Sequence, residues 1–144
     1  MFQKTNFQYI FSYLGLIPFI IILTNKYYFF IIDDHFSVNF TIYYTIIITV
    51  FIGSTNWNLN SNIDIKIVIY GFLPSMFSVV IVLLNLANIN YKYLIIFLTL
   101  FLFLQLILDY YFIYSKLKVK TAFYYVRLPL TIFIVFTLLQ IAII

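Results

Sequence analysis

The stretch Tyr91–Tyr114 reads YKYLIIFLTLFLFLQLILDYYFIY, and it indicates a helix that crosses a membrane. It contains two charged side chains, Lys92 near one end and Asp109 near the other. A spanning helix needs about 20 mainly apolar residues. A membrane β-strand alternates apolar and polar side chains over about ten positions, whereas Leu94–Leu98 (LIIFL) does not alternate. We therefore expect a transmembrane α-helix here.

Four more stretches of the chain have the same character. The sequence predicts an all-α fold, a polytopic membrane protein in which residues 1–144 form one transmembrane domain, a bundle of five transmembrane helices. The Tyr-rich segment 27–32 is interpreted as an interfacial aromatic segment, and extension of the first helix is the alternative. The five predicted spans cover residues 7–25, 38–57, 65–86, 91–114 and 121–143.

The composition excludes most soluble classes of protein. Of the 144 residues, 65% are hydrophobic and 8% are charged. A soluble domain is about half apolar and about a quarter charged, so this chain has too few charges to cover a surface in water. Cysteine is absent and His35 is the only histidine, so we expect no thiolate or multi-histidine metal site and no cofactor. His35 itself is interpreted as a solvated loop residue.

The basic residues lie between the apolar runs, which indicates a role in topology and argues against nucleic-acid binding. Five spans place most lysines on one side of the membrane, and the positive-inside rule makes that side the cytoplasm. We therefore expect a cytoplasmic N-terminus, an outer C-terminus and location in a bacterial inner membrane, or in the mitochondrial inner membrane of a eukaryote. The inner lysines are Lys4, Lys66, Lys116, Lys118 and Lys120, and the outer ones are Lys26 and Lys92.

Two charged residues lie within the predicted spans, Asp109 in the fourth and Arg127 in the fifth. Counted from the inner helix ends, the two lie at similar depths, roughly 7 and 9 Å. The connecting loop is short, so the helices are expected to be adjacent and antiparallel, with an ion pair between these side chains. Other polar or amphipathic groups fall in the same layer. The predicted intramembrane polar cluster comprises Asp109, Arg127, Asn56, Trp57 and Gln105.

The same inner layer contains the expected helix kinks, at Pro18, Pro74 and Pro129. Each proline frees the backbone carbonyl four residues earlier, and such a carbonyl needs a partner inside a membrane. Small and polar residues also recur at helical spacing on two spans, where they predict close helix packing. These stripes are Thr45, Thr49, Gly53 and Asn56 on the second span, and Gly71, Ser75, Ser78 and Asn85 on the third.

Five short motifs occur in order along the chain. They are residues 13–19 (YLGLIPF), residues 51–58 (FIGSTNWN), Leu73-Pro74-Ser75, Gln105 with Asp109, and residues 124–131 (YYVRLPLT). On these motifs the chain resembles the transmembrane protein 69 family, which is also described as a domain of unknown function. The resemblance implies the fold and the membrane class, and it implies no activity. Asn56 stands where the family has histidine, which argues against a histidine-based proton or metal role.

Three functions are compatible with these features. The first is a non-enzymatic helper or scaffold that packs with other membrane proteins or with a second copy of itself. The second is a small transporter or proton-coupled carrier that uses Asp109 and Arg127, which otherwise form a structural clamp. The third is a membrane enzyme or quinone-contacting subunit lined by Trp57, Tyr70 and Tyr124. No nucleophile–base pair or metal cluster is evident, so the prediction is that the protein is not an enzyme, and the helper is favoured.

Overall fold

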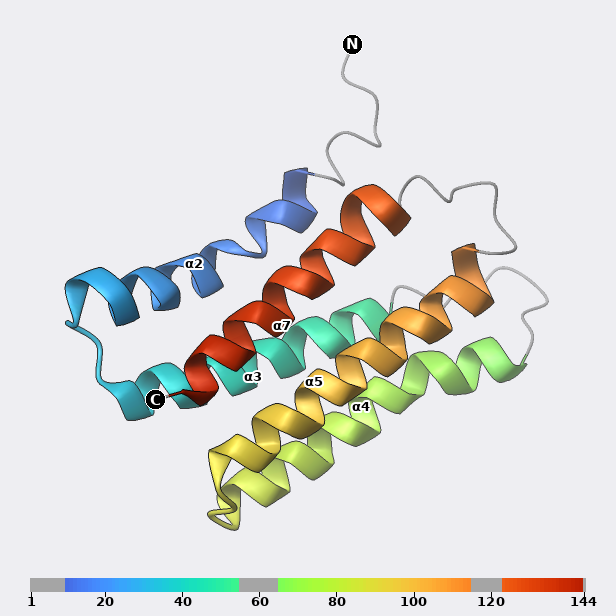
Figure 1. Ribbon diagram of the computed structural model, residues 1–144. Helices are drawn as coiled ribbons and strands as arrows, with labels where there is room; N and C mark the ends of the chain where they lie inside the picture. The colour runs from blue at the N-terminus through green and yellow to red at the C-terminus, as the bar shows by residue number, and fades with distance from the viewer. Residues whose placement is uncertain (1–9, 55–64, 115–122, 144) are drawn as a thin grey trace.

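The computed structural model describes residues 10–54, 65–114 and 123–143, and within these ranges every regular element is a helix (Figure 1). Three of the helices contain a turn of π-helix, labelled η, in which the backbone is wound more widely than in an α-helix. The elements are α2 (Ile17–Thr24), η1 (Asn25–Phe29), α3 (Asp34–Ser54), α4 (Ile65–Leu86), α5 (Tyr91–Asp109), η2 (Tyr110–Tyr114), η3 (Phe123–Arg127) and α7 (Leu128–Ala142).

Five continuous helical stretches are long and apolar enough to span a membrane. The predicted all-helical architecture is therefore confirmed for the described residues. The third and fourth stretches coincide with the predicted spans 65–86 and 91–114. The full set is Ile10–Phe29, Asp34–Ser54, Ile65–Leu86, Tyr91–Tyr114 and Phe123–Ala142.

The first two helices differ from the predicted bounds at the turn between them. The first helix continues through η1 to Phe29, so the helix extension considered for residues 27–32 is present up to that residue. It ends where Phe30 takes a left-handed conformation, with φ of 52°. The buried side chain of Asn25 closes the turn, because its Oδ1 accepts hydrogen bonds from the backbone N–H groups of Ile31 and Ile32.

The second helix begins at Asp34, four residues earlier than expected. The physical reason is a side-chain cap: Asp33 Oδ2 accepts a hydrogen bond of 3.2 Å from the backbone N–H of Phe36. A carboxylate in this position satisfies an N–H group that the first turn of a helix leaves unpaired.

The last described helix, α7, lies between α2 on one side and α3 and α5 on the other (Figure 1). It packs against α2, α3 and α5, while α4 packs against α3 and α5. The core between these helices is apolar, and many of its side chains are completely buried. They include Phe19 on α2, Ile42 on α3, Ile81 on α4, Leu98 and Leu102 on α5, and Leu138 and Ile141 on α7.

The helices α3 and α4 approach closely where the sequence predicts small-residue packing. A Cβ atom added to Gly53 would lie 2.7 Å from Pro74 Cγ and 2.9 Å from the Gly71 backbone oxygen. Only a glycine fits at this distance. The other stripe residues Thr45, Thr49 and Ser78 are buried, whereas Ser75 and Asn85 are partly exposed and Asn56 lies outside the described residues.

Candidate functional site

The ion pair expected between the fourth and fifth spans is present. Arg127 Nε lies 2.5 Å from Asp109 Oδ2, and the exposed fractions of the two side chains are 8% and 2%. A charged hydrogen bond at this distance is short and strong, and burial makes it costly to break. The contact therefore fixes the end of α5 against the start of α7.

Tyr70 of α4 completes the partners of the carboxylate. Its hydroxyl donates to Asp109 Oδ1 and lies 3.1 Å from the backbone oxygen of Gln105. Each carboxylate oxygen thus has a donor from a different neighbouring helix. The polar cluster predicted from the sequence omitted Tyr70, because a tyrosine in an aromatic-rich span resembles the many others that face outward. The one signal available was its position, four residues before Pro74 in the same layer.

Gln105 and Arg127 connect the ion pair to the rest of the bundle. Gln105 Nε2 donates to the Thr49 backbone oxygen of α3 at 3.1 Å. Arg127 Nη1 donates to Thr131 Oγ1 at 3.2 Å, and that hydroxyl donates to the Arg127 backbone oxygen at 2.9 Å. The network therefore joins α3, α4, α5 and α7 through one buried set of side chains.

Both members of the ion pair adjoin a π-helical turn. Asp109 is the last residue of α5 before η2, and Arg127 is the last residue of η3 before α7. Such turns are rare in helices and occur frequently at functional sites. Pro129 follows η3 and frees the Tyr125 carbonyl, which accepts a hydrogen bond from the Tyr13 hydroxyl. The predicted need for a partner at this proline is thus met by the first helix.

The other two predicted kinks lie in different surroundings. Pro18 is near the start of α2, directly after the turn at Gly15 and Leu16 that interrupts the first helix. Pro74 lies inside α4, where the helix continues through it. Its own backbone oxygen accepts a hydrogen bond of 2.6 Å from Ser78 Oγ.

Two polar atoms of the cluster are buried without a hydrogen-bond partner among the described residues, Arg127 Nη2 and Gln105 Oε1. A buried donor or acceptor of this kind is costly, and a water molecule or a ligand group usually satisfies it. The cluster therefore has one donor and one acceptor available in addition to its internal bonds.

The remaining predicted site residues do not join this cluster in the described structure. Asn56 and Trp57 lie outside the described residues, so their places in the cluster stay predictions. Tyr124 has 52% of its surface exposed, whereas Tyr70 is buried, so these two do not share one lined surface. His35 is exposed and lies on α3 near its start, distant in sequence from the ion pair. Among the described residues, no three His, Cys, Asp or Glu side chains gather as a metal site.

Comparison of the chain with family models, curated proteins and solved structures found no match. The resemblance to the transmembrane protein 69 family therefore stays a prediction based on the five motifs.

Proposed function

We propose that the chain is a five-span integral membrane protein that acts as a non-enzymatic helper or scaffold and packs with other membrane proteins. The kinship with the transmembrane protein 69 family belongs to the same proposal. The five long apolar helices support insertion into a bilayer. The lysine distribution supports a cytoplasmic N-terminus and an outer C-terminus in a bacterial or mitochondrial inner membrane.

The observation that carries the helper function is the closure of the polar cluster by the chain itself. Both oxygens of Asp109 have donors from this protein, Tyr70 on α4 and Arg127 at the start of α7. A buried carboxylate held in this way stabilises one arrangement of helices. The cluster therefore serves as a clamp, and the clamp gives the outer faces of the helices a fixed geometry on which a partner can pack.

We expect a photo-crosslinking amino acid on an outer helix face to capture one defined membrane-protein partner. Suitable positions are Phe72 of α4, Phe97 of α5 and Phe136 of α7, each about half exposed. A helper in contact with a fixed partner should give a discrete adduct from at least one face, identified by mass spectrometry. The matched control is Phe19, which is fully buried and should give none. Lipid adducts alone at all three positions would contradict the helper function.

The second candidate is a proton-coupled carrier, and the two unpartnered atoms Arg127 Nη2 and Gln105 Oε1 favour it. They give a water or a substrate group a place beside an ion pair. The adjoining π-helical turns are the kind of backbone feature that rearranges in functional sites. In this function Asp109 binds the proton, and Tyr70 and Arg127 control the release of the proton.

For the carrier, Asp109→Asn is expected to abolish proton flux, because the amide cannot ionise. It should also lower the stability, because it leaves the buried Arg127 without its charge partner. The measurement is quenching of a pH-sensitive dye inside proteoliposomes under an imposed potential. Thermal unfolding checks the fold of the variant, and Asn85→Asp provides a control carboxylate distant from the cluster. Wild-type flux no greater than that of protein-free vesicles would exclude the carrier.

A further inference from the structure

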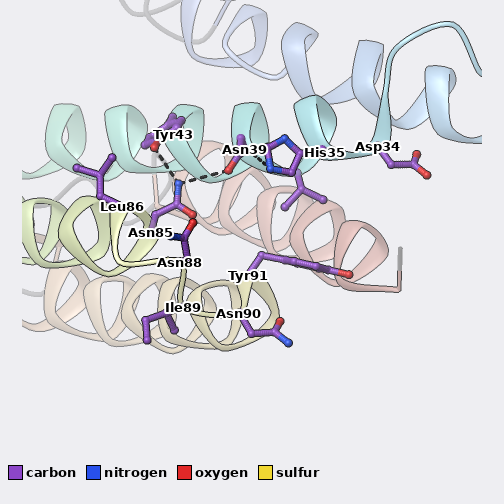
Figure 2. Close-up of a pocket in the computed structure, with 11 residues that line it drawn as sticks. Asp34, His35, Asn39, Tyr43, Asn85, Leu86, Asn88, Ile89, Asn90 and Tyr91 are labelled. Atoms are coloured by element: carbon purple, nitrogen blue, oxygen red, sulfur yellow. Dashed lines mark hydrogen bonds between the residues drawn. The ribbon is translucent and has the colours of Figure 1, made fainter.

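A second polar region, drawn in Figure 2, lies where α4 turns into α5, at the opposite end of α5 from the ion pair (Figure 1). It is an open groove of about 620 Å³ between the start of α3, the end of α4 and the start of α5. The turn that connects α4 to α5 forms its floor, and there Asn88 takes a left-handed conformation with φ of 57°. The described lining residues are Asp34, His35, Val38, Asn39, Tyr43, Asn85, Leu86, Asn88, Ile89, Asn90 and Tyr91.

Hydrogen bonds across the groove arrange its polar groups. Figure 2 shows Asn85 reaching from α4 toward two residues of α3, and its Nδ2 donates to Tyr43 Oη at 2.8 Å and to Asn39 Oδ1 at 3.3 Å. Asn39 Nδ2 in turn lies 3.2 Å from His35 Nδ1. The network holds these four side chains in place along one wall of the groove. A preorganised set of this kind costs less entropy when a ligand binds.

Several groups in the groove remain available to a ligand. Tyr43 accepts from Asn85, so its own hydroxyl proton is free to donate. Within the described part of the chain, no hydrogen bond is present to Asn85 Oδ1, to the side-chain amide of Asn88 or to the Asp34 carboxylate. Apart from this carboxylate, the groove offers neutral donors and acceptors side by side, which is the pattern that suits hydroxyl groups.

The charge of the groove favours an uncharged ligand. Among its described lining residues Asp34 is the only charged side chain, and none is Lys or Arg. Lys92 lies beside the groove, with its Nζ 5.8 Å from the ring centroid of the lining residue Tyr91. Lys26 lies near enough to Asp34 to interact with its charge, so the carboxylate is partly balanced. A dianionic group is therefore disfavoured, and an ammonium group has only one partly neutralised carboxylate to bind.

An apolar groove continues from the polar one along α3. It measures about 290 Å³ and is lined by Phe36, Asn39, Phe40, Tyr43, Tyr44 and Ile47. Asn39 and Tyr43 belong to both grooves, so the two are contiguous. Phe36, Phe40 and Tyr44 form a stacked row with ring centroids 6.0 and 5.7 Å apart. A polar groove that opens directly into an aromatic one matches a molecule with a polar head and a hydrocarbon chain.

From these two grooves we propose that the protein binds a lipid with an uncharged, hydroxyl-rich headgroup. The headgroup lies against Asn85, Asn88 and Tyr43, and the acyl chain follows the row of rings on α3. This inference rests on the membrane insertion proposed above, but it is independent of the helper and carrier functions. With the helices inserted as proposed, the end of the bundle that holds the grooves lies at the membrane surface, which is the level of a lipid headgroup.

The test is native mass spectrometry of the full chain released from nanodiscs that contain equal amounts of three lipids. The probes are monoglucosyl diacylglycerol, phosphatidylglycerol and phosphatidylcholine. We expect the glucosyl lipid to be retained about fivefold more than either phospholipid, which corresponds to about one net hydrogen bond. Water-soluble methyl glucoside at the same concentration should not displace it, because it lacks the acyl chain.

Variants locate the site. Asn88→Gly removes an amide while glycine keeps the left-handed backbone, and Asn85→Leu removes the central amide at similar volume. Each of these two variants should reduce the preference for the glucosyl lipid over the phospholipids to about twofold or less. Phe36→Ala should weaken retention of the glucosyl lipid about threefold. Phe136 on α7 is similarly exposed but lies outside the grooves, so Phe136→Ala should not weaken it. Asp34→Asn should leave the preference unchanged, since an uncharged headgroup does not need the charge.

Each contrary result overturns a defined part of the proposal. Equal retention of the three lipids, or preference for phosphatidylglycerol, overturns the uncharged headgroup site. A preference for phosphatidylcholine that Asp34→Asn abolishes indicates an ammonium ligand instead, and displacement by methyl glucoside indicates a free sugar site. Alkaline carbonate extraction separates these outcomes from a failure of the proposed function. A chain that carbonate releases from membranes overturns the insertion itself, whereas a retained chain without preference overturns the lipid site alone.

Discussion

Arg127→Ala is expected to lower the free energy of unfolding by about 3–5 kcal/mol, because it leaves the Asp109 carboxylate buried without its charge partner. The exposed fraction of that carboxylate side chain is 2%, so solvent cannot replace the guanidinium. Tyr70 still donates a hydrogen bond to this carboxylate, so the loss of stability stays below the free-energy cost of burying a charge that has no partner. Denaturant-dependent circular dichroism in detergent micelles measures the change.

The matched control is Lys92→Ala, which removes an exposed cation and should change stability by less than about 0.5 kcal/mol. The double variant Asp109→Leu/Arg127→Met should recover most of the loss, since apolar side chains of similar volume often replace a buried pair at little cost. A double variant as unstable as Arg127→Ala would contradict the clamp. It would show that the two side chains matter separately.

Gly53→Ala is expected to destabilise the fold by about 1–3 kcal/mol through forced separation of α3 and α4. The added methyl group would lie 2.9 Å from the Gly71 backbone oxygen, and a backbone atom cannot turn away as a flexible side chain can. Separation would also strain the nearby contact between Gln105 and the Thr49 carbonyl. We therefore expect a lower melting temperature in detergent.

The control for this substitution is the neighbouring residue, since Ser54→Ala changes an exposed side chain on the same turn of α3. Within the described residues its hydroxyl donates to the Phe51 carbonyl of its own helix. A melting temperature for Gly53→Ala equal to that of Ser54→Ala would show that the α3–α4 contact tolerates a wider spacing than the structure has.

Much of the fold could be predicted from the sequence because apolar length is a strong and local signal. Residues 65–86 and 91–114 are mainly apolar runs bounded by polar residues in the sequence, and their bounds match the structure. The turn near Phe30 could not be predicted, because the point where the first helix ends depends on how the folded chain is arranged around it. The Asn25 side chain closes it, and nothing in the residues 27–32 indicates that bond.

The ion pair was predictable because charges are scarce. With two charged residues at similar depth in consecutive spans, one pairing was available, and Asp109 and Arg127 form it. Tyr70 was not predictable as a partner, since the 14 tyrosines of the chain look alike in the sequence and only the rotation of α4 selects one. The groove near Asn85 was missed for a similar reason: its walls come from three helices, and no single stretch contains its pattern.

The position of α7 sets an order on how the described bundle can assemble. This helix follows the other described helices in the sequence, yet it packs against α2, α3 and α5. The other helices therefore cannot reach their described arrangement before α7 has been made. Until α7 arrives, Asp109 lacks Arg127, and a buried carboxylate without its charge partner is unfavourable. We infer that α5 and α7 pair before the bundle closes around them.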